Sequence, residues 1–118
     1  MSETSARLHR TEILTSDVEG IPFGAYIAET NGGIIDSALK PLQNQLLSSQ
    51  ELHLLKDWLN SHPWSSLARK IWAGNLVCFG KPGSFHAPIL YYKGGTFVCI
   101  SYWVIGYWES NYRVTLHR

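Results

Sequence analysis

The sequence has few charged residues, an almost even balance of charge and no long apolar segment. Charged residues make up 16% of the 118 residues, and ten Lys and Arg against nine Asp and Glu leave a formal net charge of +1. No strong field of one sign steers a polyanion to such a chain, which disfavours a nucleic-acid partner. Hydrophobic residues reach 45%, enough to build a core. We therefore expect a single domain over residues 1–118, with residues 1–6 as a loose polar terminus.

Cysteine is scarce as well. The two residues present, Cys78 and Cys99, are too few for a disulfide-dense scaffold or a four-cysteine zinc site. Both lie in apolar runs, which favours two buried thiols over the alternative of a cross-strand disulfide. The first residues show no apolar segment typical of a signal peptide, and the longest apolar stretch, residues 96–108, is shorter than a membrane helix. The default expectation is a cytoplasmic protein with no membrane association.

Two short helices are predicted in the middle of the chain. Ser48 and Glu51 have the spacing of a capping box, in which a hydroxyl and a carboxylate satisfy backbone N–H groups of the first turn. Apolar residues follow at helical spacing until about Asn60, namely Leu52, Leu55 and Leu59. Pro63 suits the first position of a second helix, with Trp64 on its apolar side and Gly74 just after its end.

Strand patterns occupy both ends of the chain. They cover residues 8–14, 23–28, 76–79, 89–93, 96–105 and 112–117, and a two-residue turn, Gly94-Gly95, joins two of them. Residues 96–105 are apolar on both faces, which predicts a central strand. Residues 112–117 alternate between apolar and polar, which predicts a strand near an edge. The fold class that follows is α+β, with two or three short helices packed on an antiparallel sheet that ends in a C-terminal β-meander.

Aromatic residues gather near the end of the sequence. Seven tyrosine and tryptophan residues lie within 22 residues: Tyr91, Tyr92, Tyr102, Trp103, Tyr107, Trp108 and Tyr112. They can fill the core, line an apolar pocket in a curved sheet, or form a surface for a protein partner. Stacking on a nucleic acid is disfavoured because single-strand binders need a basic groove beside their aromatics, and this region is poor in basic residues.

One pair of residues is a candidate for acid–base chemistry. His86 lies in a loop that enters an apolar strand, and Glu109 is the only acidic residue after Asp57. In a meander, the start of one strand and the end of the next lie at the same edge of the sheet, so His86 and Glu109 can meet. The five histidines are too widely spaced for a local metal-binding motif, and we expect no metal and no cofactor.

No motif in the sequence defines a function. The excess of aromatic residues without a catalytic constellation favours a non-catalytic binding or interaction protein that uses an aromatic-rich antiparallel sheet. Its partner would be a second copy in a homodimer, another protein or a small apolar ligand. The alternative is a small enzyme with a pocket in the curved sheet, in which His86 and Glu109 act as acid and base.

Overall fold

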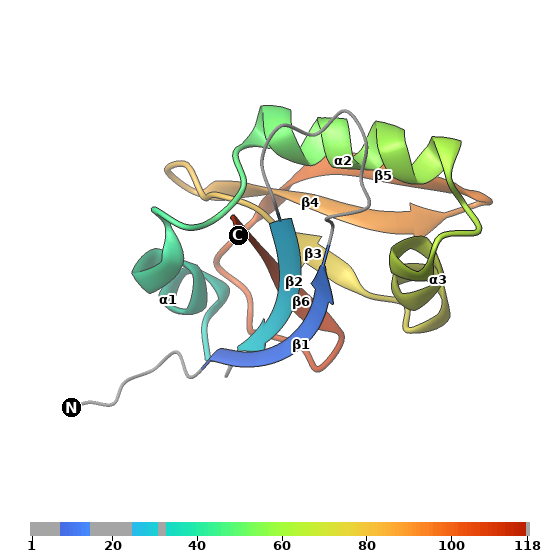
Figure 1. The fold of residues 1–118 in the computed structure, drawn as a ribbon. Coiled ribbons are helices and arrows are strands. Elements are labelled where there is room, and N and C mark those ends of the chain that lie inside the picture. Colours follow the sequence, from blue (N-terminus) through green and yellow to red (C-terminus); the bar gives the residue numbers. More distant parts are fainter. Residues whose placement is uncertain (1–7, 15–24, 31–32, 118) are drawn as a thin grey trace.

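The computed structural model describes residues 8–14, 25–30 and 33–117 (Figure 1). Six strands form one sheet in the order β1-β2-β6-β3-β4-β5. The strands are β1 (Leu8–Leu14), β2 (Ala25–Thr30), β3 (Val77–Phe79), β4 (His86–Lys93), β5 (Thr96–Trp103) and β6 (Tyr112–His117). The helices are α1 (Ile35–Leu39), the short 3-10 helix η1 (Lys40–Leu42), α2 (Ser49–Ser61) and α3 (Ser66–Ala73). The terminus expected at residues 1–6 lies outside the described residues.

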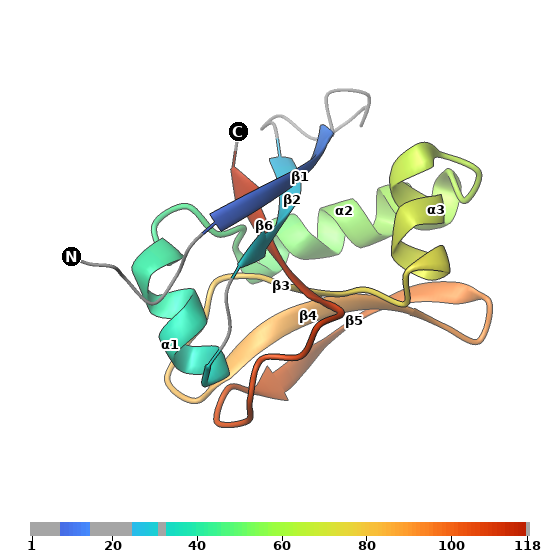
Figure 2. The same ribbon diagram turned by 90° about the horizontal axis from the view of Figure 1, so that it is seen from below.

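The α+β class predicted from the sequence is confirmed, but the sheet is mixed and not purely antiparallel. β3, β4 and β5 form an antiparallel meander, and the turn between β4 and β5 places Gly94 and Gly95 at positive φ. β6 does not continue this meander. It returns to the other side of β3 and runs parallel to it, with Cys78 opposite Arg113. β6 also pairs with β2, so it joins the two halves of the sheet (Figure 2).

The predicted positions of the last two strands are therefore wrong, and each error has a physical reason. β6 lies inside the sheet, between β2 and β3, and its polar Thr115 is buried there with its hydroxyl donating to the Phe79 carbonyl at 2.7 Å. A satisfied hydroxyl can occupy the interior at little cost. β5 lies at the edge, and its last four residues are exposed although Ile100, Tyr102 and Trp103 are largely apolar. Although β5 is apolar on both faces, the helices do not cover both of its faces.

Helix α2 begins where the sequence predicts. The Ser48 N–H donates to Glu51 Oε1 at 2.8 Å, and the Glu51 N–H donates to Ser48 Oγ at 3.2 Å, which completes the capping box. His117, at the end of β6, contacts the same Glu51 carboxylate oxygen at 2.8 Å through Nε2. The first turn of α2 is thus held both by its own cap and by His117 at the end of the inner strand β6.

Helix α3 begins later than predicted. Its cap is Ser65, whose hydroxyl accepts the Ala68 N–H at 3.2 Å, so Pro63 lies in the preceding turn. Trp64 consequently does not join the apolar side of the helix and is 69% exposed. The residue with positive φ after the helix is Asn75, at 51°, while Gly74 keeps a negative φ.

Helices cover the sheet on both faces. On one face, α2 and α3 bury their leucines against Cys78, Leu90 and Phe97. On the other face, α1 and η1 pack with Phe79, Ile89 and Val114. Residues that alternate along one strand therefore enter two different cores, as Cys78 and Phe79 do in β3. The edge strand β5 receives only part of this coverage.

Candidate functional site

A groove of about 550 Å³ lies beside β5. Three segments line it: the start of α2, the loop between β3 and β4, and the adjoining parts of β4 and β5. Its polar and thiol groups come mainly from Ser49, His53, Lys81, His86, Cys99 and Ser101. These residues are far apart in the sequence, and the packing of α2 on the sheet brings them together.

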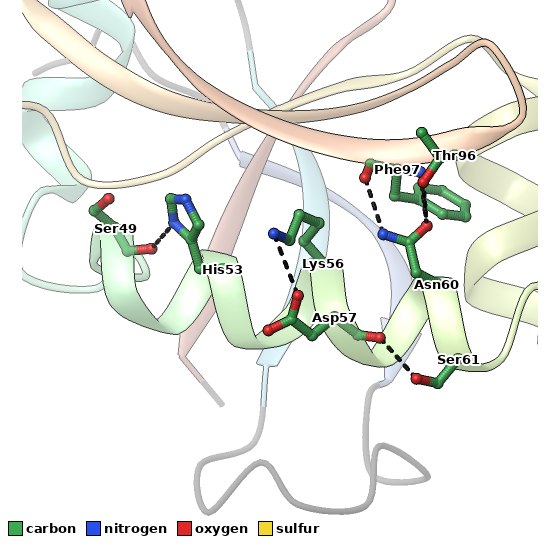
Figure 3. A network of polar contacts seen from close by, with 8 residues as sticks. All are labelled: Ser49, His53, Lys56, Asp57, Asn60, Ser61, Thr96 and Phe97. Carbon is green, nitrogen blue, oxygen red and sulfur yellow. Dashed lines mark hydrogen bonds and ion pairs between the residues drawn. The ribbon is translucent and has the colours of Figure 1, made fainter.

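Towards the C-terminal end of α2, Asn60 holds the backbone of β5 (Figure 3). Asn60 Oδ1 accepts the Phe97 N–H at 2.8 Å, and Asn60 Nδ2 donates to the Phe97 carbonyl at 3.0 Å. The Thr96 hydroxyl also donates to Asn60 Oδ1, at 2.9 Å. The side-chain amide therefore makes the two hydrogen bonds that a neighbouring strand would make at Phe97.

Further along β5, the outward-facing backbone groups have no such partner. In an antiparallel pair, alternate residues turn N–H and C=O towards the paired strand, and the residues between turn them away. The contacts of Asn60 place Phe97 among the outward-facing residues, so Cys99, Ser101 and Trp103 share its orientation. Among the described residues, no hydrogen bond uses the outward groups of these three. This stretch of β5 is an open sheet edge that borders the groove.

The groove carries basic groups on several sides. His53 Nδ1 lies 2.8 Å from the Ser49 carbonyl oxygen. Because a carbonyl only accepts, Nδ1 carries the proton and Nε2 remains for a ligand. Lys81 and His86 belong to the loop and to β4. No Asp or Glu is found among the described residues that line the groove.

Lys56 and the two cysteines decide whether the groove offers a reactive thiolate. The Lys56 ammonium forms an ion pair with Asp57 at 3.2 Å (Figure 3). Burial raises the pKa of the Cys99 thiol to about 11, although the charge of Lys56 acts in the opposite direction. Burial likewise raises the pKa of Cys78 to about 12. Both cysteines are free, and both are protonated at neutral pH, so neither supplies a thiolate nucleophile.

An exposed aromatic end adjoins the groove. The rings of His86 and Trp103 lie 4.2 Å apart between centroids, across the last pair of β4 and β5. Trp103 is 55% exposed, and Phe85, next to His86 in the chain, and Tyr107, four residues after Trp103, are 62% and 74% exposed. Ile105 lies between them in the chain and is exposed as well. We call Phe85, Trp103, Ile105 and Tyr107 the aromatic end.

The seven aromatic residues singled out in the sequence divide into two groups. Four are partly buried and pack against the two cores: Tyr91, Tyr92, Trp108 and Tyr112. Tyr102, Trp103 and Tyr107 are exposed. Tyr102 forms a hydrogen bond with Tyr112. Burial, and to a smaller extent this hydrogen bond, raises the pKa of Tyr112 to about 12. The seven residues thus do not form one continuous surface.

The two catalytic candidates occupy different surroundings. His86 begins β4 and packs on Trp103, whereas Glu109 lies in the turn before β6, close enough to raise the pKa of Tyr112. Both are exposed, and within the described ranges no hydrogen bond or ion pair joins them. The proposed acid–base pair stays a prediction, since the meander on which it was based ends at β5.

Sequence reasoning missed most of the groove. His53 was counted among scattered histidines, and Lys81, Ser101 and Asn60 carried no motif. One local signal was the capping box at the neighbouring helix start, through Ser48. The helical spacing of His53, Lys56 and Asn60, which places them on one side of α2 facing β5 in Figure 3, was the remaining signal.

Comparison with known proteins gives no match, either to a protein family, to a curated protein or to a solved structure. In the parts of the chain that the structure describes, no three His, Cys, Asp or Glu side chains come together as a metal site. The helices of those same parts lack the length and apolar character that crossing a membrane requires. The geometry of the groove and of the aromatic end is therefore the basis for a functional proposal.

Proposed function

We propose that the protein is a binding module that accepts an extended segment of a partner polypeptide as an added strand along β5. The observation that carries the proposal is the open backbone edge at Cys99, Ser101 and Trp103 beside a groove. At about 3.4 Å per residue, a segment of roughly five residues spans this stretch. Its backbone would pair with the outward N–H and C=O groups, as in other cases of strand addition.

The aromatic end supplies surface for the same partner. Phe85, Trp103 and Tyr107 together expose on the order of 400 Å², since a buried aromatic side chain removes roughly 150–250 Å² from water. Tryptophan and tyrosine are also enriched where partner proteins bind. A segment that leaves the groove past Trp103 would contact this surface.

A single extended segment suits the groove better than a second copy of the chain. If two β5 edges paired to form one continuous sheet around a twofold axis, both α2 helices would lie on the same face. The Lys81 ammonium groups that line the two grooves would then lie on the same face of the joined sheet. Like charges brought together in this way oppose association. A homodimer is accordingly an alternative outcome that light scattering can detect.

Binding is favoured over catalysis by the chemistry of the groove. The Cys99 thiol is protonated at neutral pH, and His86 packs on an aromatic ring without a carboxylate to orient it. An effective general base needs an acid or another orienting group within hydrogen-bond reach. Neither lining histidine has such a carboxylate among the described residues.

The proposal is tested by selecting displayed random decapeptides on the immobilised full chain and titrating the selected peptides in solution. The decisive variant is Ser101→Pro, which removes an outward N–H without removing a hydrogen bond to β4. We expect it to weaken peptide binding at least tenfold. Ser101→Ala keeps the N–H and should bind like the wild type. Circular dichroism would verify that both variants are folded.

A second measurement keeps the test valid if Ser101→Pro does not fold. Peptides methylated at alternate backbone nitrogens should lose binding in one alternation and keep it in the other, because only one set of N–H groups faces β5. The proposal is wrong if selection yields no peptide, or if every selected peptide tolerates Ser101→Pro and both methylation patterns. Peptide-free light scattering that shows a dimer sensitive to Ser101→Pro would make a second copy the occupant instead.

A further inference from the structure

We infer that the segment bound along β5 presents a carboxylate group to the α2 side of the groove. The inference rests on the proposed function, because it names the chemistry of the partner at that same site. It adds a requirement that strand addition alone does not impose, since backbone pairing is independent of side-chain charge.

The charges around the groove are the first line of support. Lys81 lines the groove and makes no ion pair among the described residues. The imidazoles of His53 and His86 also line the groove. Because the described lining contains no Asp or Glu, the Lys81 ammonium has no counter-charge in the groove. An anionic group brought by a ligand would supply it.

The acidic residues of α2 are already engaged. Asp57 pairs with Lys56, which keeps that cation from competing for a ligand. Glu51 accepts the Ser48 N–H and contacts His117, so its carboxylate belongs to the helix cap. Neither acidic residue is part of the groove lining. The Lys81 ammonium is therefore not neutralised by the acidic residues of the helix that forms the groove wall.

The geometry of strand addition places one partner side chain in the groove. Phe97 and Cys99 point towards α2, where they pack with its leucines, so Ser101 points to the same side. A residue directly opposite Ser101 on an added strand has its side chain on that side too. This side chain would enter the groove that His53 and Lys81 line.

A carboxylate can come from two sources, and both satisfy the inference. An internal Asp or Glu can occupy the position opposite Ser101, or the partner chain can end there and present its terminal carboxylate. In both cases the ligand gains hydrogen bonds from charged donors, which are stronger than those between neutral groups.

Four versions of one selected peptide test the inference. The parent peptide is compared with a version in which Asp and Glu are replaced by Asn and Gln, a version with an amidated C-terminus, and a version with both changes. We expect the doubly changed peptide to bind at least tenfold more weakly than the parent. The two single changes then show whether the side chain or the terminus provides the carboxylate.

The variant Lys81→Gln tests the protein side of the proposed contact with the carboxylate. It should reduce the preference for the parent over the doubly changed peptide, and binding of the parent should lose part of its dependence on salt. Lys93→Gln, at the exposed turn between β4 and β5, removes the same charge away from the groove and should leave the preference unchanged.

The outcomes separate this inference from the function on which it rests. If the peptides bind, lose binding with Ser101→Pro and yet tolerate loss of every carboxylate within twofold, the carboxylate inference is wrong and strand addition stands. The carboxylate inference is equally wrong if Lys81→Gln and Lys93→Gln have equal effects on the preference. If no peptide depends on Ser101, the proposed function itself fails.

Discussion

Removing the Asn60 side chain tests how the edge strand is held. Asn60→Ala deletes the two hydrogen bonds to the Phe97 backbone and the one from the Thr96 hydroxyl. Each bond between neutral groups contributes about 0.5–1.5 kcal/mol net, and the lower half applies here because water can reach the freed groups at a sheet edge. Alanine also gains about 0.6 kcal/mol of helix propensity over asparagine.

The net expectation is a loss of about 1–2.4 kcal/mol in the free energy of unfolding. For a domain of this size, that loss corresponds to a fall of roughly 3–14 °C in Tm. Urea melts followed by circular dichroism measure the free energy, and a thermal scan measures Tm. The matched control is Ser61→Ala, which removes a 3.1 Å bond to the Asp57 carbonyl within the same helix and touches no strand. It should cost no more than about 0.5 kcal/mol.

The reasoning is refuted if Asn60→Ala and Ser61→Ala have the same midpoint as the wild type. In that case the amide bridge would contribute nothing measurable, and β5 would be held by its pairing with β4 and by the burial of Phe97. A second readout is the state of association. Freeing the Phe97 backbone lengthens the open edge, so Asn60→Ala should aggregate more readily than Ser61→Ala in light scattering.

Three further predictions concern stability. Ser48→Ala removes the cap hydroxyl of α2 and should cost about 1 kcal/mol in urea melts, and an unchanged midpoint would contradict the role of the cap. Burial raises the pKa of Glu51, but its hydrogen bonds and its histidine partner outweigh burial, so the net pKa lies below its ordinary value. Stability from Glu51 is therefore present at neutral pH and lost as acid protonates the folded form, and Glu51→Gln should flatten the acid limb of a stability–pH curve. Gly80→Ala would place a Cβ 2.8 Å from the Leu47 carbonyl oxygen and should cost about 1–3 kcal/mol, whereas Gly83→Ala, with its nearest atom at 3.6 Å, should be nearly neutral.

Local sequence signals located the helices and turns well. The Ser48 and Glu51 pair marked the start of α2, and Gly94-Gly95 marked the turn between β4 and β5. Both depend on residues within three positions of one another, so the sequence contains the whole interaction. The start of α3 was misplaced because two local signals competed, and the Ser65 cap prevailed over the proline preference.

Interactions between distant segments were not predictable in the same way. β6 pairs with β2 and β3, and its Thr115 hydroxyl reaches the Phe79 carbonyl 36 residues away; an alternating pattern does not contain that information. The groove also depends on contacts between residues that are far apart in the sequence. His53, Lys81 and Ser101 become neighbours only once α2 has packed across the sheet, and none of them belongs to a motif of its own.

The place of β6 also determines the order in which the protein can be completed. β1 and β2 pair with each other, and β6 is the strand that connects this hairpin to β3, β4 and β5. During synthesis β6 emerges after all the other described strands. Until then the two parts of the sheet each expose an edge that β6 will later occupy, and an unpaired edge of this kind invites association with other chains. The time between synthesis of β5 and docking of β6 is therefore the period in which the nascent chain is most exposed to misassembly.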